Sequence, residues 1–204
     1  MKSLASNFIK ISVLIFIIIL TTSTSCVRRN TPKNYFKIGD NTYLYDFGTN
    51  GAGRAKIKLK NTKAGDVIKI RYAELLDKDG MPIVGVYRDV YFPNDGNPGA
   101  DAEFSVRNLD VYVCKGDEEE VYYPRFAYTG FRYIYIEGYD GAHTEETVKG
   151  LRMNTDLEKT GDIVTRDGDI MKIWDAVKRS YLSNAFTGPT DCPTREKNFW
   201  NGDI

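Results

Sequence analysis

The pentapeptide Ala55-Lys56-Ile57-Lys58-Leu59 decides the fold class, because its residues alternate between apolar and charged. A period of two is typical of a β-strand with one buried face and one solvated face. We expect further strands where similar apolar runs occur, at residues 43–47, 67–72, 111–114 and 131–136. Together these runs predict a mainly β domain that covers residues 33–150.

Turn-forming residues separate the predicted strands. Clusters rich in Gly, Asn, Asp or Pro occur at residues 48–53, 77–80, 94–99 and 115–118, and such clusters favour tight turns. Short strands at this spacing, with no helical pattern between them, predict an antiparallel β-sandwich rather than a parallel sheet with crossover helices. Residues 48–53 precede a strand and not a helix, so we expect no dinucleotide or phosphate site there.

The composition narrows the class of protein. A chain of 204 residues has room for one domain of ordinary size and a remainder, and its 42% hydrophobic and 27% charged residues are ordinary for a globular protein. The balance of 28 basic and 28 acidic residues disfavours an electrostatic grip on nucleic acid. Cys114 and Cys192 fall in different predicted domains, so we expect neither a disulfide nor a zinc site.

The first 25 residues have the pattern of an export signal. Lys2 and Lys10 precede the apolar run Val13–Leu20, which is too short for a membrane span, and small polar residues lead to Cys26. We predict a lipoprotein signal peptide over residues 1–25, with Cys26 as the lipidated first residue of the mature protein. Ordinary cleavage that leaves a free Cys26 thiol and an uncleaved anchor are the alternatives. Because Val27-Arg28-Arg29 is not acidic, the periplasm is favoured over the cell surface.

Three features have both a functional and a structural interpretation. The 14 tyrosines gather in stretches such as 121–128 and 131–135, where they could form a platform for sugar rings, but packing in half-buried strands is the favoured interpretation. Asp117–Glu120 could supply calcium ligands, but a solvated turn is favoured. His143 lies in a turn-like segment and is expected on the surface. We therefore predict neither a metal nor a cofactor.

The apolar period changes after Leu151. One helical stripe is formed by Ile170, Ile173, Trp174, Val177 and Tyr181, with Asp167 placed to cap its start and Gly188-Pro189 to end it. This predicts that residues 151–204 are a linker and the opening of a second, helical domain.

The segment Thr190–Asp203 contains the densest chemistry of the chain. Carboxylates, an arginine and a tryptophan lie close together in it. Glycoside hydrolysis needs such an inventory, because a carboxylic acid protonates the leaving oxygen while other carboxylates bind sugar hydroxyls and an aromatic wall excludes water. A solvated loop with incidental charges is the alternative.

Four motifs resemble bacterial α-L-rhamnosidases of glycoside hydrolase family 78. They are Tyr45-Asp46-Phe47-Gly48, Ala73-Glu74-Leu75-Leu76-Asp77, the run from Pro124 to Tyr133 and, most specifically, Asp191-Cys192-Pro193-Thr194-Arg195-Glu196. The resemblance runs from about residue 40 to residue 204. It implies that the first three motifs belong to the β-sandwich that precedes the catalytic domain, and that the last lies in the loop that enters an (α/α)₆ barrel.

The resemblance also implies roles for single residues. Glu196 matches the general acid of an enzyme that hydrolyses terminal α-L-rhamnosides with inversion. Asp191, Arg195, Trp200 and Asp203 match residues that surround the bound rhamnose. Phe199 departs from the pattern, since many family members have glycine there, and it adds bulk beside the sugar pocket.

The general base of the family is a glutamate far downstream in the barrel, beyond Ile204. The resemblance therefore implies an α-L-rhamnosidase whose partner is a rhamnose-containing glycan, and we expect these 204 residues to be inactive on their own. Two alternatives are a lipid-tethered carbohydrate-binding β-sandwich without catalysis and a structural fragment of a longer enzyme. In each case the membrane is a partner only through the lipid anchor.

Overall fold

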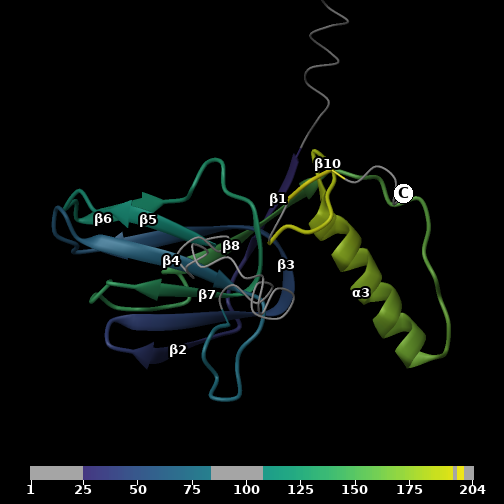
Figure 1. Cartoon of the computed structure of the whole chain (residues 1–204), viewed down its shortest axis with the longest axis horizontal. Helices are drawn as coiled ribbons and strands as arrows, with labels where there is room; N and C mark the ends of the chain where they lie inside the picture. Colours follow the sequence, from purple (N-terminus) through teal and green to yellow (C-terminus); the bar gives the residue numbers. More distant parts are fainter. Residues whose placement is uncertain (1–24, 84–107, 195–196, 200–204) are drawn as a thin grey trace, which may run out of the picture.

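The computed structural model describes residues 25–83, 108–194 and 197–199. They form a β domain, a long helix and a short C-terminal segment after the helix (Figure 1). The strands of the β domain are β1 (Ser25–Asn30), β2 (Asn34–Gly39), β3 (Thr42–Lys60), β4 (Val67–Ala73), β5 (Leu109–Val113), β6 (Glu119–Tyr122), β7 (Thr129–Glu137) and β8 (Val148–Thr155). They are followed by α3 (Gly168–Asn184), β9 (Ala185–Phe186) and β10 (Gly188–Pro189).

Strand β3 is the central strand of one curled antiparallel sheet, because it pairs with β2, β6, β7 and β8. The strand order is β1-β8-β3-β7-β4-β5, and β2 and β6 pair with β3 outside this path. The first residues of β3 pair with β2 and β7, whereas its last residues pair with β8 and β6. The predicted fold class, mainly β and antiparallel with a helix after the sheet, is confirmed.

The predicted turn at residues 48–53 is wrong. The two strands predicted at residues 43–47 and 55–59 are parts of the same strand, because β3 continues through the glycine-rich stretch between them. Glycine clusters are as compatible with a β-bulge as with a turn, and the local sequence does not distinguish the two.

The glycine-rich stretch forms a bulge in β3. The pairing of β3 with β7 shifts register between Asp46 and Gly51, so that residues 47–50 lie opposite Arg132 alone. Gly48 has a φ of 77°, a conformation that side chains with a Cβ rarely adopt. The bulge lets one long strand change partners along its length.

Aromatic and branched residues fill the space enclosed by the curled sheet. The favoured interpretation of the tyrosines as packing residues is confirmed, because Tyr45 and Tyr72 are almost fully buried and Tyr128, Tyr133 and Tyr135 are less than 9% exposed. The main core cluster consists of Tyr45, Phe47, Ala55, Ile57, Leu59, Ile68, Ile70, Tyr72, Cys114, Phe131, Ile134, Ile136, Tyr139 and Val148.

Four strands of the large sheet, β1, β2, β6 and β8, were not predicted, because they lack a strict alternation of apolar and polar residues. The two-residue strands β9 and β10 were not predicted either. Strand β8 passes through residue 150, at which the sequence suggested a domain boundary, and β1 pairs with β8 along its whole length. The backbone of Cys26 pairs with Asn154, whereas the Cys26 side chain is outside the described part of the structure.

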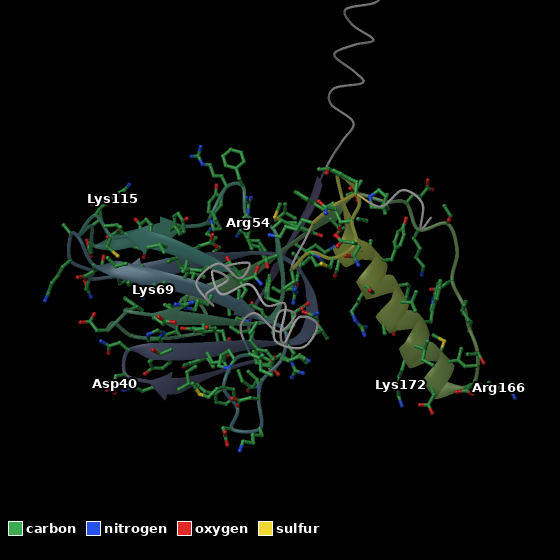
Figure 2. All side chains as sticks on the ribbon, viewed as in Figure 1. Asp40, Arg54, Lys69, Lys115, Arg166 and Lys172 are labelled. Atoms are coloured by element: carbon green, nitrogen blue, oxygen red, sulfur yellow. The ribbon has the colours of Figure 1, made fainter. Side chains whose placement is uncertain are left out.

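The interpretation of Asp117–Glu120 as a solvated turn is wrong for Glu120. Its side chain is only 3% exposed and accepts hydrogen bonds from Thr62 Oγ1 (2.6 Å), Tyr112 OH (2.5 Å) and the backbone N–H groups of Lys115 and Gly116. Burial raises the pKa of this carboxyl group, but the hydrogen bonds outweigh burial and lower the pKa to about 2. Glu120 therefore fixes the β5–β6 turn. In Figure 2 the labelled Lys115 marks this turn, at the far end of the sheet from α3.

His143 is a structural residue rather than the surface residue that the sequence suggested. Its ring stacks on Tyr43 with centroids 3.6 Å apart, its Nδ1 lies 2.7 Å from Tyr45 OH, and its Nε2 lies 3.1 Å from the carbonyl oxygen of Tyr139. A carbonyl only accepts, so the Nε2 position carries the proton and neutral Nδ1 accepts from Tyr45 OH. Burial lowers the pKa of His143.

Helix α3 begins where the sequence predicted. Asp167 is its N-cap and accepts hydrogen bonds from the backbone N–H groups of Asp169 (2.9 Å) and Ile170 (3.2 Å). The helix contacts β3 and β8, but no residue in it is buried, and the predicted apolar stripe is exposed, with Ile173 at 64% and Tyr181 at 59%. Figure 2 shows Arg166 and Lys172 at the helix start, away from the sheet.

Among the residues that the structure describes, no helix has the length and apolar character needed to cross a bilayer.

We predict that the pKa of His143 in the folded chain lies below its ordinary value of 6.5, because burial disfavours the imidazolium. Stability is then fully present above pH 6.5 and decreases as the pH falls through the lowered pKa. Since His143 is the only histidine, an NMR pH titration of its ring protons measures this pKa without any assignment problem. The same titration in urea supplies the reference, and a folded-state pKa at or above the urea value would contradict the prediction.

Candidate active-site loop and the sheet edge beneath it

A closed loop at residues 190–199 follows the β9–β10 hairpin. Its two ends are joined by a bridge between Thr190 and Phe199, by a hydrogen bond from Asp191 N to Asn198 O (3.1 Å) and by one from Asn198 N to Asp191 Oδ1 (3.1 Å). Thr190 also anchors the loop to the end of α3, because its N–H and its hydroxyl both donate to the carbonyl of Asn184, at 2.8 and 3.1 Å.

The structure describes one of the predicted catalytic and sugar-binding residues. Asp191 lies at the neck of the 190–199 loop and is partly buried. The predicted general acid Glu196 and the predicted rhamnose-binding residues Arg195, Trp200 and Asp203 lie outside the described residues. Their roles therefore remain predictions.

Phe199, the departure from the family pattern, lies at the neck of the loop, where it is 60% exposed. Its ring lies against Gly188, since a Cβ added to that glycine would meet the ring. The bulk of Phe199 is thus accommodated by the β9–β10 hairpin.

The first sheet motif explains how the bulge of β3 is held. Asp46 forms a two-point ion pair with Arg132, from Nε to Oδ1 and from Nη2 to Oδ2, each 2.9 Å long. Asp46 Oδ1 also accepts from the backbone N–H of Gly48 at 2.6 Å. Burial raises the pKa of Asp46, but the hydrogen bonds from Arg132 and Gly48 outweigh burial and lower the pKa below its usual range.

The second and third sheet motifs meet beneath the loop. Glu74, which follows β4, accepts a hydrogen bond from Asn50 Nδ2 of the bulge at 2.7 Å. Gly130 of β7 lies directly under the loop, since a Cβ at this position would collide with Thr194 Oγ1 and Glu74 Oε1. Three of the motifs that carry the family resemblance thus border the fourth.

A polar cavity of about 490 Å³ lies between these parts. The sheet contributes the bulge Gly48–Gly51 and Glu74, the loop contributes Cys192 and Pro193, and α3 contributes Ala176, Arg179, Ser180, Ser183 and Asn184. Its lining therefore combines a carboxylate, a guanidinium, hydroxyls and amides, which are groups that suit hydrogen bonding to a polar ligand or to further protein. No cluster of side chains suited to a metal ion occurs among the residues that the structure describes.

A larger cleft of about 730 Å³ lies beside this cavity, between the sheet, the linker and α3. Trp174 and Lys178 of α3 line it, and both interact with Asp162 of the linker. No predicted site residue that the structure describes lines the larger cleft, so it is set apart from the loop.

Sequence reasoning missed Arg152, which braces the bulge from the opposite side. Its guanidinium donates to the carbonyl oxygens of Phe131 (2.8 Å) and Thr49 (2.7 Å) and lies 4.1 Å from the centre of the Phe131 ring. Burial lowers the pKa of Arg152 to about 10. Arg152 falls in the segment that the sequence predicted to be a linker. Its role could be recognised only once this segment was known to form β8, beside the bulge.

Sequence reasoning also missed Asp110, which lies in β5 and pairs with Ile70 of β4. Tyr72 OH donates to Asp110 Oδ2 at 2.6 Å. Burial raises the pKa of Asp110, whereas the hydrogen bond from Tyr72 and the positive charge of Lys197 act in the opposite direction. Lys197 of the loop is thus near enough to Asp110 for their charges to interact.

Two family models match consecutive parts of the chain. The bacterial alpha-L-rhamnosidase concanavalin-like domain matches residues 36–154, and the bacterial alpha-L-rhamnosidase 6 hairpin glycosidase domain matches residues 158–204. The first match ends in β8, and the second contains both α3 and the 190–199 loop.

Individual alpha-L-rhamnosidases are similar to this chain in sequence and in structure. An alpha-L-rhamnosidase of Formosa agariphila is 34% identical over 172 residues, which are 84% of this chain and 17% of that protein. The solved structure of an alpha-L-rhamnosidase from Dictyoglumus thermophilum has 34% identity and a TM-score of 0.70 over 83% of this chain and 17% of that one. The Streptomyces avermitilis alpha-L-rhamnosidase complexed with L-rhamnose has 26% identity and a TM-score of 0.75 over 89% of this chain and 16% of that one. The chain thus spans less than a fifth of the length of these relatives.

We predict that Asp46→Asn lowers the free energy of unfolding by about 2 kcal/mol, because it leaves the partly buried Arg132 guanidinium without its carboxylate. Urea denaturation measures the change. Glu119→Gln is the matched control, since Glu119 pairs with Lys58 at the surface with both side chains 42% exposed, and solvent screens such a pair so that it contributes much less to stability than a partly buried one. Equal effects of the two substitutions would contradict the assigned role of Asp46.

Proposed function

We propose, because this chain belongs to the bacterial α-L-rhamnosidase family, that it forms the β domain and the acid-bearing loop of an enzyme that hydrolyses terminal α-L-rhamnosides. The observation that carries the proposal is the contact between two parts of the chain. The described part of the motif, Asp191-Cys192-Pro193-Thr194, follows a neck that Thr190 and Asp191 form with Asn198 and Phe199, and at Thr194 it lies on the sheet beside Gly130 and Glu74. Further support comes from the order of the two matched domains.

In the proposed reaction Glu196 is the general acid. It protonates the glycosidic oxygen as the bond to the anomeric carbon breaks, while a water molecule attacks that carbon from the opposite face and inverts its configuration. Asp191, Arg195 and Asp203 bind the sugar hydroxyls, and Trp200 forms part of the wall of the sugar pocket. The hydrogen bond from Asn198 N to Asp191 Oδ1 supports this role, because it fixes one carboxylate oxygen at the neck of the loop.

The proposed reaction also needs a general base. Inverting glycosidases use a second carboxylate about 6.5 to 9.5 Å from the acid to activate the attacking water. In the family this base lies far downstream of the residues matched here, and we therefore propose that the 204 residues alone do not turn over substrate. The exposed stripe of α3 supports a larger catalytic unit, because Ile173, Val177 and Tyr181 need further helices to cover them.

We predict that Glu196→Gln abolishes acid catalysis by a chimeric enzyme in which residues 25–204 replace the matching segment of the Formosa agariphila relative. The kcat for an aryl α-L-rhamnoside with a poor leaving group should fall about 1,000-fold, whereas a dinitrophenyl rhamnoside, which needs no acid, should react at nearly the unsubstituted rate. Loss of a proton donor is the physical reason for this difference.

Glu158→Gln in the linker is the matched control and should leave both rates unchanged. The 204-residue chain by itself should release no detectable aryl alcohol. Equal losses on both substrates in the Glu196→Gln chimera would remove Glu196 as the acid, and turnover by the 204-residue chain that Glu196→Gln abolishes would overturn the proposed inactivity.

We also propose that the protein is exported and held in the membrane by a lipid on Cys26, with the domains in the periplasm. The pairing of β1 is compatible with cleavage before Cys26, because the cut would remove Ser25 alone from the strand and leave Cys26–Asn30 paired with β8. The lipid would then emerge at the end of an ordered edge strand, close to the β domain.

We predict that Cys26→Ala moves the protein from the membrane fraction of the producing bacterium to the soluble fraction. The thioether that carries the lipid cannot form without the Cys26 sulfur, so the acyl chains that supply the proposed membrane affinity are lost. Fractionation followed by immunoblotting measures the distribution. Cys114→Ala is the control, and its product should stay with the membrane. Retention of Cys26→Ala in the membrane would favour an uncleaved apolar anchor.

A further inference from the structure

The hydroxyl group of Thr194 is an unusual feature of the 190–199 loop. Its Oγ1 atom is buried and has no hydrogen-bond partner among the residues that the structure describes. A buried hydroxyl that has lost its hydration without gaining a partner is costly, and native proteins rarely leave one in that state. The surroundings of Thr194 should therefore contain an acceptor within reach.

Glu74 supplies an acceptor near the Thr194 hydroxyl. Its Oε1 and the Oγ1 of Thr194 both lie less than 3.0 Å from the position that a Cβ would take on Gly130. The two oxygens are therefore neighbours across the face of this glycine. Glu74 Oε1 already accepts from Asn50 Nδ2, and a carboxylate has lone pairs for several donors. A small rotation of either side chain, or one bridging water, connects the pair.

Gly130 makes this approach possible. It is the second residue of β7 and has no unusual backbone conformation, so a left-handed turn does not explain why glycine occupies the position. Any larger residue would place its Cβ between Thr194 and Glu74 and push the loop off the sheet. Because Gly130 has no side chain, the stretch Thr129-Gly130-Phe131 lets Thr194 of the loop lie directly against the sheet.

Lys197 lies on the other side of Glu196 in the sequence, and its positive charge acts to lower the pKa of Asp110 of β5. Thr194 and Lys197 therefore flank Arg195 and Glu196 in the sequence, which the family resemblance matches to a sugar-binding residue and to the general acid.

We propose that Glu74 is a positioning residue that holds the 190–199 loop on the sheet through the hydroxyl of Thr194. The proposal rests on the proposed function only in the statement that the held loop carries the acid. In this arrangement the β domain sets the position of the loop that precedes Glu196, and Glu74 needs no contact with substrate.

The thiol of Cys192 reports on the seating of the loop without any substrate. Cys192 lies two residues before Thr194 and lines the cavity that Glu74 also lines. We would measure the rate at which iodoacetamide alkylates Cys192 in the full 204-residue chain carrying Cys26→Ser, with mass spectrometry of the Cys192 peptide as the readout. Cys114 is 3% exposed, so its alkylation monitors global unfolding in the same sample.

Substitutions at the two positions form a double-mutant cycle. Thr194→Val and Glu74→Ala should each raise the alkylation rate of Cys192 about tenfold, because a loop that has lost one hydrogen bond opens more often. The double variant should react no faster than either single variant, since both act through one interaction. Thr194→Ser and Glu74→Gln keep a donor and an acceptor, and both should react at the unsubstituted rate.

Glu137→Ala is the matched control, because it removes a carboxylate that pairs with Arg71 on another part of the sheet. It should leave the alkylation of Cys192 unchanged. Unsubstituted rates in Thr194→Val and Glu74→Ala, or multiplied effects in the double variant, would overturn the proposal. These results do not depend on rhamnoside hydrolysis, so a failure of Glu196 as the acid and a failure of Glu74 as a positioning residue are separate outcomes.

Discussion

The ion pair between Asp46 and Arg132 fixes the bulge in β3, and this bulge lets the strand pair with β2 and β7 at its start and with β8 and β6 at its end. A regular strand of this length would keep one register with β7, yet residues 47–50 all lie opposite Arg132. The carboxylate of Asp46 holds Arg132 and the backbone N–H of Gly48 together, and Arg152 binds the carbonyl of Thr49 from the other side. Because the bulge is fixed in this way, Tyr45 before it, Phe47 at its start and Ala55, Ile57 and Leu59 after it all belong to one core.

Much of the fold could be predicted from local sequence. The alternation in residues 55–59 and the stripe with its Asp167 cap depend on neighbours along the chain, so β3, β4, β5, β7 and α3 were recognised. The bulge could not be predicted, because glycines mark turns and bulges alike and the difference lies in Arg132, far away in the sequence. Glu120 and His143 were misjudged for a similar reason. Their burial is set by Thr62, Tyr112, Tyr43 and Tyr45, which no local pattern connects to them.

The candidate site, like the fold, could be predicted from sequence only in part. The chemistry of the 190–199 loop was visible in sequence, since its carboxylates and its Asp-Cys-Pro motif are contiguous. The surface on which the loop lies was not visible. Gly130 and Glu74 come from β7 and from the end of β4 and become neighbours only when these strands pair, while Asp110 lies on β5, which pairs with β4. Asp110 carried no motif, and Arg152 was hidden in an apparent linker, so neither could be connected to the loop before the sheet was known.

The location of the family-like motifs bears on what the β domain does. The motifs contribute core residues such as Tyr45, Phe47 and Phe131. Their members Asp46, Glu74 and Gly130 lie instead where the sheet meets the loop, and none of these three contributes apolar burial. Both carboxylates have a hydrogen-bond partner there, Arg132 for Asp46 and Asn50 for Glu74, so they fix the surface on which the loop lies. The boundary between the two matched domains therefore does not separate scaffold from site, because the sheet edge and the loop form one structural unit.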